Sequence, residues 1–254
     1  MPTTALAPHF LGGGKIELTT HSYRDPGPGE LLLRVEADAV CGTDREQYFE
    51  GSACVPGHEG VGVVIGVGDD VQTAVGTRGA IFSLDHCGHC RSCLAGHTNQ
   101  CMAERDDMGF TADGAYGPIE VVHETNFFPV PDKISGVEAT LLLDGMGTSG
   151  HALGRIGGIR EDVESLYVAG AGVGHGEGLA LTVSPDLIAP ERTVMGSECF
   201  RITEMAENLE ILLANRELFG RIITHRVPRW EIARAFELFL SGETGKVVVV
   251  EDET

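Results

Sequence analysis

The sequence predicts a mixed β and α/β fold, with a β domain in the first half of the chain and a smaller α/β part after it. The first half holds several short runs rich in Val and Leu that are separated by Gly and Pro, a pattern typical of a barrel-like or sandwich β domain. The second half instead carries apolar residues at helical spacing and closes with a strand-like run over 246–251.

The strand signals of the first half lie in four stretches. Residues 29–40 alternate and are rich in Leu and Val, and residues 59–68 form a β-branched run punctuated by Gly. Residues 114–123 and 126–132 are further short strand signals with turn residues between them. We expect these four stretches to be strands of the β domain.

The second half begins with a predicted helix. Residues 134–156 open with Ser135 as a candidate N-cap, and Glu138 three residues later completes a capping box. A further helix is expected over 202–218, where apolar residues recur at helical spacing and Thr203 could act as the cap.

The last predicted helix, over 228–242, is amphipathic. Trp230, Ile232 and Phe236 are among the residues that it is expected to turn inward, and Gly242 follows its end. The strand over 246–251 comes next and is expected to join the β domain in space.

The charge balance limits the partners that this chain can have. Its 254 residues include 18 basic and 38 acidic side chains, which gives a net charge of −20. Such a chain repels nucleic acid and anionic lipid, so neither is an expected partner. Its apolar runs are much shorter than the roughly 20 residues that span a bilayer, and no signal peptide is visible at the N-terminus. We therefore expect a soluble, cytoplasmic protein.

Four of the seven cysteines lie in one short stretch, at Cys87, Cys90, Cys93 and Cys101. Close cysteine pairs in a chain without a secretory signal suggest metal or redox chemistry rather than disulfides. Four thiolates from one loop can close a tetrahedral shell around Zn²⁺ and leave no open position, which is the pattern of a structural site. The sequence therefore predicts a structural zinc lobe here.

A second set of candidate ligands is spread over the chain. Cys41 is followed closely by Thr43, the pair His58 and Glu59 lies in a Gly-rich stretch, and Asp144 comes much later. Thiolate, imidazole and carboxylate are all zinc ligands, and three protein ligands leave a fourth position for water or substrate. Together these residues have the pattern of a catalytic zinc site.

The order and spacing of these motifs resemble those of the zinc-dependent medium-chain alcohol and polyol dehydrogenases. The resemblance rests on VCGTDRE at 40–46, PGHEGVGVVIGVGDDV at 56–71 and the four-cysteine lobe. It covers residues 10–150, and the stretch at 113–132 looks most like the glucose dehydrogenase branch. The resemblance implies a GroES-like β-barrel catalytic domain with a Rossmann-like nicotinamide domain.

The resemblance also assigns roles to individual residues. Cys41 and His58 become ligands of the catalytic zinc. Glu59 becomes a nearby carboxylate that can bind zinc or hold its water, and Asp144 becomes the remaining ligand. Thr43 becomes the hydroxyl that takes a proton from a zinc-bound alcohol.

The proton relay departs from the family's pattern. The family often has a His shortly after the Cys41 motif, whereas this chain has Gln47 and Tyr48 in that region. We therefore expect a relay that is shorter or that passes through water. Asp44 is expected to orient the Cys41 turn rather than to bind metal.

The coenzyme domain departs most from the family. A complete doubly wound fold needs about 130–150 residues, and only roughly half of that length is present between 151 and 224. A candidate phosphate-binding turn carries Gly170, Gly172 and Gly174, but His175 occupies the place of a fingerprint glycine. Because the following stretch is too rich in Gly to be a good helix, NAD(P) binding is left open.

The sequence therefore predicts a GroES-like zinc-binding catalytic domain over 1–150, completed by 225–254, and a reduced Rossmann-like remnant over 151–224. Two Zn²⁺ ions are expected, one structural and one catalytic. The preferred function is a zinc-dependent oxidoreductase acting on a sugar, polyol or other alcohol. A coenzyme-independent zinc lyase, dehydratase, isomerase or hydrolase is the second function considered, and a non-catalytic zinc-binding scaffold is the third.

The expected partner is a small molecule with a hydroxyl or carbonyl group. We also expect a homo-oligomer, because a shortened sheet would expose an edge that pairing could cover.

Overall fold

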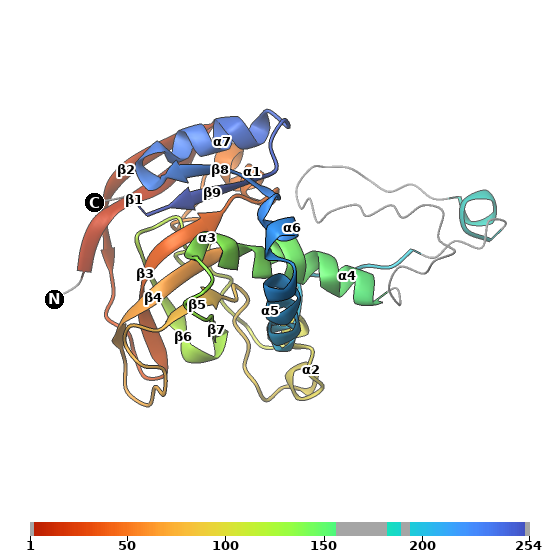
Figure 1. Cartoon of the computed structure of the whole chain (residues 1–254), viewed down its shortest axis with the longest axis horizontal. Helices are drawn as coiled ribbons and strands as arrows, with labels where there is room; N and C mark the ends of the chain where they lie inside the picture. Colours follow the sequence, from red (N-terminus) through yellow and green to blue (C-terminus); the bar gives the residue numbers. More distant parts are fainter. Residues whose placement is uncertain (1–2, 156–181, 189–193, 252–254) are drawn as a thin grey trace.

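The computed structural model describes residues 3–155, 182–188 and 194–251 of the chain (Figure 1). Its main sheet has seven strands: β3 (Glu30–Ala39), β4 (Gly60–Val67), β5 (Arg78–Ile81), β6 (Ile119–His123), β7 (Phe127–Pro129), β8 (Ile223–Pro228) and β9 (Lys246–Val250). The strand order is β7-β5-β4-β3-β9-β8, and β6 pairs with β3 off this path. The strands predicted from the four stretches and from the C-terminal run are therefore present.

Strand β3 organises the sheet because three other strands pair with it. Its first half pairs with β6, its second half pairs with β9, and β4 accompanies it along most of its length. These pairings are antiparallel, whereas β8 and β9 are parallel. Leu31, Leu33 and Val35 on alternate positions are fully buried, so the alternation seen in the sequence marks the inner face of the sheet.

The first strands of the chain form a separate hairpin that the sequence analysis did not predict. β1 (Thr3–Gly12) and β2 (Lys15–Tyr23) pair antiparallel as a two-stranded sheet. Gly13 and Gly14 at the turn have positive φ angles of 59° and 77°, which favour glycine. The hairpin lies against α1 (Asp44–Glu50) in the fold.

An aromatic core joins this hairpin to the C-terminal helix α7 (Ile232–Leu240), which lies near β1 and β2 in Figure 1. Phe10 meets Phe236 edge to face with 5.1 Å between ring centroids, and Tyr48 stacks on Phe236 at 4.9 Å. Since offset-stacked and edge-to-face pairs stabilise beyond simple area burial, this core holds α1 and α7 against the hairpin.

The segment that carries Asp144 is helical but interrupted. The predicted capping box at Ser135 is confirmed and begins α3 (Gly136–Ala139). Leu143 then leaves helical geometry (φ −80°, ψ −123°), a π-helical turn covers Asp144–Thr148, and α4 (Ser149–Arg155) follows. The single helix expected for this segment is therefore wrong, because its glycines lower helix propensity and the turn redirects Asp144.

The helix expected over 202–218 is divided in two. α5 (Met205–Ala214) and α6 (Arg216–Gly220) are separated at Asn215. Thr203 is not the cap that the sequence suggested. The Glu204 carboxylate instead accepts the backbone N–H of Arg201 at 2.9 Å, as in a capping box.

Trp230 was expected to face inward, and this expectation is wrong. It is 60% exposed, since it lies in the 3₁₀ turn before α7 and not on the buried face of the helix. Ile232 and Phe236 are buried as expected, and Gly242 follows the helix with a positive φ of 71°.

Some sequence predictions fall outside the described residues. The turn with Gly170, Gly172 and Gly174 is one of them, and the domain boundaries at 150 and 224 stay predictions. Within the described part of the chain, the longest helix has 10 residues, and no helix combines the length and apolar character needed to cross a membrane.

Candidate metal centres

Three strand ends bring the dispersed ligand candidates together. β3 and β4 are antiparallel, so Cys41 after β3 and the pair His58 and Glu59 before β4 lie at the same end of the sheet. β9 is antiparallel to β3, which brings its first residue, Lys246, to this end as well. Sheet register therefore assembles these residues.

Asp144 reaches this group from the helical segment. Residues 141–143 before it are buried in the core, and the Thr148 hydroxyl donates to Asp144 Oδ1 at 2.9 Å. The other oxygen, Asp144 Oδ2, lies 3.2 Å from Cys41 Sγ and 3.3 Å from His58 Nε2. The interrupted helix thus aims the carboxylate at the thiol and the imidazole.

The assembled side chains fit a zinc ion. Ligand atoms from four residues lie within 4.8 Å of one another: Cys41, His58, Glu59 and Asp144. Tetrahedral zinc with bonds of about 2.0–2.3 Å places its ligand atoms about 3.3–3.8 Å apart, close to the two distances from Asp144. Among the residues described, buried Glu59 Oε2 has no hydrogen-bond partner. Thiolate, imidazole and carboxylate together form a donor set that zinc accepts.

Asp44 holds two of these residues in place. Its Oδ1 lies 3.1 Å from His58 Nδ1, which leaves Nε2 facing Asp144. Its Oδ2 accepts the Cys41 backbone N–H at 2.9 Å and the Tyr116 hydroxyl at 2.6 Å. Because Asp44 is fully buried, it orients the imidazole and the Cys41 turn, which is the role expected for it.

Gly57 allows the chain to approach closely beside His58. Its φ of 102° is in the left-handed region, and a Cβ there would lie 2.0 Å from Asp38 Oδ2 and 2.5 Å from the Tyr116 nitrogen. A side chain at this position would therefore displace the turn that presents His58.

Lys246 belongs to this centre and was missed by the sequence analysis. Its ammonium pairs with Glu59 Oε1, and its side chain is only 15% exposed. Burial alone would lower the pKa of Lys246, but the Glu59 carboxylate and the Cys41 thiol outweigh it and raise that pKa. Burial raises the pKa of Glu59 to about 7, against the opposing effect of Lys246. Two features of the sequence could have drawn attention to Lys246: the chain has only three lysines, and this one directly precedes a run of valines.

Of the three residues considered for a proton relay, Thr43 lies beside a candidate metal ligand, whereas Gln47 and Tyr48 make contacts elsewhere. The Thr43 hydroxyl lies 3.3 Å from His58 Nε2, and although Thr43 stands at the start of α1, its side chain makes no capping hydrogen bond there. Gln47 Nε2 donates to a backbone carbonyl at 2.6 Å, and Tyr48 stacks on Phe236 in the aromatic core. Neither side chain therefore extends a relay from Thr43.

The four-cysteine lobe forms a second candidate centre. The Sγ atoms of Cys87, Cys90, Cys93 and Cys101 lie within 4.8 Å of one another. The Cys90 N–H donates to Cys87 Sγ at 3.3 Å, and the Cys93 N–H donates to Cys90 Sγ at 3.5 Å. Backbone N–H groups of Met102 and Cys93 lower the pKa of Cys90 to about 6, which favours a metal-binding thiolate.

The lobe has little apolar support of its own. Gly88 and Gly96 adopt positive φ angles of 70° and 81° at its turns, on either side of the short helix α2 (Arg91–Leu94). None of residues 83–97 is buried, and Leu94 is 76% exposed. We therefore expect a bound metal to contribute most to holding this lobe in one conformation.

Comparison with known proteins identifies the class of domain that carries these centres. The alcohol dehydrogenase GroES-like domain matches residues 27–132. The L-threonine 3-dehydrogenase of Chromobacterium violaceum is 32% identical over 166 residues, which are 62% of this chain and 47% of that enzyme. The corresponding enzyme of Shewanella woodyi is 33% identical over 155 residues, 58% of this chain and 44% of its own. This chain therefore carries an alcohol dehydrogenase GroES-like domain and is similar to medium-chain alcohol and polyol dehydrogenases, and it spans about half the length of the curated relatives it matches.

Solved structures share the fold at low identity. A thermostable alcohol dehydrogenase from Pyrobaculum aerophilum has a TM-score of 0.83 at 20% identity, covering 98% of this chain and 100% of that one. Galactitol-1-phosphate dehydrogenase from Escherichia coli has a TM-score of 0.81 at 18% identity, with the same coverage. The GroES-like fold class that the sequence predicted is confirmed.

Proposed function

We propose that this chain is a zinc-dependent oxidoreductase that interconverts a small alcohol, polyol or sugar and the corresponding carbonyl compound. The observation that carries this proposal is the convergence of Cys41, His58 and Asp144 at one end of the GroES-like sheet, with the Thr43 hydroxyl beside them. The dehydrogenase names of the relatives support the same reaction class.

Cys41, His58 and Asp144 would hold the catalytic zinc, and Glu59 is close enough to bind it or to hold its water. Zinc bound there supplies a Lewis acid that stabilises negative charge on a substrate oxygen. Asp44 keeps the imidazole oriented toward the ion. Lys246 holds one Glu59 oxygen, which limits how far that carboxylate can reach into the position meant for substrate.

Thr43 is the residue that moves the proton. Its hydroxyl neighbours the ligand His58 and can accept a hydrogen bond from a substrate hydroxyl at the same centre. Because Gln47 and Tyr48 are engaged elsewhere, the proton passes from Thr43 to water without a further side chain. This is the short relay that the sequence suggested.

Oxidation of an alcohol also needs a hydride acceptor, and we expect NAD(P). A zinc-binding dehydrogenase from Sinorhizobium meliloti with the same fold was solved bound to NADP. The contacts expected from Gly170, Gly172 and Gly174 lie outside the described residues, as do all of 156–181 and 189–193 in the proposed Rossmann-like remnant. A homo-oligomer and a cytoplasmic location are further parts of this proposal.

The test is a coupled measurement of metal content and turnover. Zinc-loaded protein is assayed with NAD⁺ and NADP⁺ over sugars, polyols, secondary alcohols and L-threonine, and Cys41→Ser is compared with the matched control Cys54→Ser. We expect coenzyme-dependent oxidation of at least one substrate class, lost in Cys41→Ser and kept in Cys54→Ser.

Two other outcomes would overturn this proposal. Turnover with zinc and substrate but without coenzyme would identify the chain as a zinc lyase, dehydratase, isomerase or hydrolase. A single zinc per chain, unaffected by Cys41→Ser, would identify a non-catalytic scaffold that keeps only the four-cysteine metal.

A further inference from the structure

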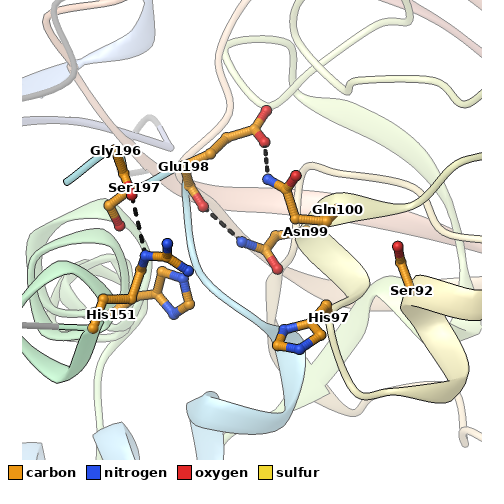
Figure 2. A pocket seen from close by; sticks show the side chains of 9 residues that line it. Ser92, His97, Asn99, Gln100, His151, Gly196, Ser197 and Glu198 are labelled. Atoms are coloured by element: carbon orange, nitrogen blue, oxygen red, sulfur yellow. Dashed lines mark hydrogen bonds between the residues drawn. The ribbon is translucent and has the colours of Figure 1, made fainter.

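A polar cavity of about 590 Å³ lies between the four-cysteine lobe and α4 (Figure 2). Three segments line it: residues from 92–100 of the lobe, His151 and Arg155 of α4, and residues 196–198. In Figure 2, His151 lies across the cavity from His97 and Ser92. The volume lies within the range of small-molecule sites, and none of the candidate metal ligands lines the cavity. It is therefore a separate site from the Cys41 centre.

The cavity contains a guanidinium that has no ion-pair partner among the described residues. Arg155 lines it, and its Nε donates to the Gly196 carbonyl at 3.1 Å. No carboxylate of the described residues forms an ion pair with Arg155, so its two terminal nitrogens keep their donors available. The planar guanidinium presents N–H donors whose geometry matches the oxygens of a carboxylate or phosphate.

The acidic groups near the cavity are already engaged. Glu198 Oε2 accepts from Gln100 Nε2, and Glu198 Oε1 lies 3.7 Å from the Arg105 guanidinium. The carboxylate of Glu204 contacts His151 Nδ1 at 2.9 Å. These partners reduce the repulsion that an incoming anion would meet, and they leave Arg155 as the charge it would find.

Two further polar groups in this wall lack partners. Asn99 is 2% exposed; its Nδ2 donates to the Glu198 carbonyl at 2.7 Å, whereas its Oδ1 has no partner among the described residues. The buried Ser197 Oγ also has none in the part of the chain described. Buried polar atoms normally find a hydrogen-bond partner, and here an acceptor and a hydroxyl are left for hydroxyl groups of a ligand.

We propose that this cavity binds a small hydroxylated anion, a phosphate monoester or a hydroxycarboxylate. Arg155 binds its oxyanion through paired N–H donors, and Asn99 Oδ1 accepts from a ligand hydroxyl. The ligand bridges the four-cysteine lobe and α4, the helix that continues from the turn carrying Asp144. This site is distinct from the proposed catalytic centre, and binding there does not require turnover.

The experiment is calorimetric titration of the zinc-loaded chain at constant ionic strength. Glycerol 3-phosphate, glycerate and glycerol are the three probes, which carry a phosphate, a carboxylate and no charge. We expect saturable binding of at least one anion, with the tighter of the two identifying the oxyanion, and no detectable binding of glycerol. Arg155→Gln is expected to weaken anion binding about tenfold or more, since it removes a charge-assisted contact.

Two more variants make this test specific. Arg234→Gln removes the same charge from an exposed position on α7 that pairs with Glu231, and it should leave binding unchanged. Ser92→Asp places a carboxylate at the cavity wall and should weaken binding even if Arg155→Gln fails to fold. Glycerol binding as tightly as the anions, no saturable anion binding, or equal affinity in Ser92→Asp and wild type would each overturn the proposal.

Discussion

The two candidate zinc centres are built in opposite ways. The four-cysteine lobe takes its thiols from one stretch, 87–101, and has almost no buried side chain around them. The Cys41 centre joins residues as far apart as Cys41 and Asp144, 103 positions along the chain, and surrounds them with buried Asp44 and half-buried Lys246. We therefore expect the first arrangement to depend on metal for its shape, whereas the sheet and core shape the second.

The largest expected effect is removal of one thiol from the lobe. Cys93→Ala should release the structural zinc and unfold the lobe, because structural zinc contributes on the order of 10 kcal/mol of folding free energy in small zinc domains. Zinc content by mass spectrometry should fall by one ion per chain, and limited proteolysis should cut within residues 83–105. The control Cys54→Ala should keep the wild-type zinc content and cleavage pattern. A variant that keeps its zinc and resists cleavage would contradict the dependence of the lobe on metal.

The Cys41 centre should behave differently when its thiol is removed. Cys41→Ser is expected to lower kcat/KM by about 10³-fold, since the charge stabilisation by zinc is worth several kcal/mol. The free energy of unfolding by urea should change by only about 1 kcal/mol, because the sheet and the aromatic core position this site. If Cys41→Ser destabilises the fold as much as Cys93→Ala does, the contrast between the two centres is wrong.

Lys246 offers a smaller perturbation of the same centre. Lys246→Met removes the cation beside Glu59 and should reduce zinc affinity or kcat/KM about 10- to 100-fold, the usual cost of losing a group that orients a metal site. Lys246→Arg should restore much of the loss, and Lys133→Met, at an exposed lysine, should have no effect. Unaltered zinc affinity together with unaltered kcat/KM in Lys246→Met would argue against this role.

The last prediction is a pH dependence of stability from the core beside the Cys41 centre. Burial, with help from the nearby Asp38 and Asp113, raises the pKa of Glu120 well above its usual value. The folded state therefore favours the protonated form, so this stabilisation is present below about pH 4.3 and is lost as the pH rises through the raised pKa. Glu120→Gln should remove this loss, which is at most about 1.4 kcal/mol per pH unit.

Glu124 is expected to change the stability of the fold with pH in the opposite direction to Glu120. Hydrogen bonds from Thr73 and Gln72 lower its pKa, so its stabilisation is present above the usual carboxyl pKa and is lost as the pH falls.

The Glu120 prediction is measured by urea unfolding at pH 5 and pH 8 with saturating zinc. The stability of the Glu120→Gln variant relative to wild type should increase as the pH rises. A constant difference between the two proteins at both pH values would refute the raised pKa of Glu120.

Several elements could be predicted because their signals are local. The strands at β3 and β4 follow from alternation and β-branched runs, and the start of α3 follows from the capping box at Ser135. The β1–β2 hairpin was missed, and so was the break at Leu143, although the glycines of the turn directly after it lower helix propensity.

The site residues also differ in whether a local sequence signal or only the tertiary structure reveals their role. Asp44 could be assigned an orienting role from its place in the motif, and its contacts with His58 and Cys41 agree with that role. Lys246 carries no motif, and only the pairing of β9 with β3 brings it to Glu59. The cavity beside Arg155 likewise joins three segments that have no common pattern.

The amino-acid order alone determined the four-thiol cluster, because ligands a few residues apart converge through turn geometry that Gly88 and Gly96 already permit. It also determined which residue types were available for the second centre. Tertiary structure decided how Cys41, His58 and Asp144 meet, how Lys246 reaches Glu59, and that a polar cavity opens beside α4. The reason is physical: contacts between distant segments depend on strand register and core packing, which no local stretch encodes.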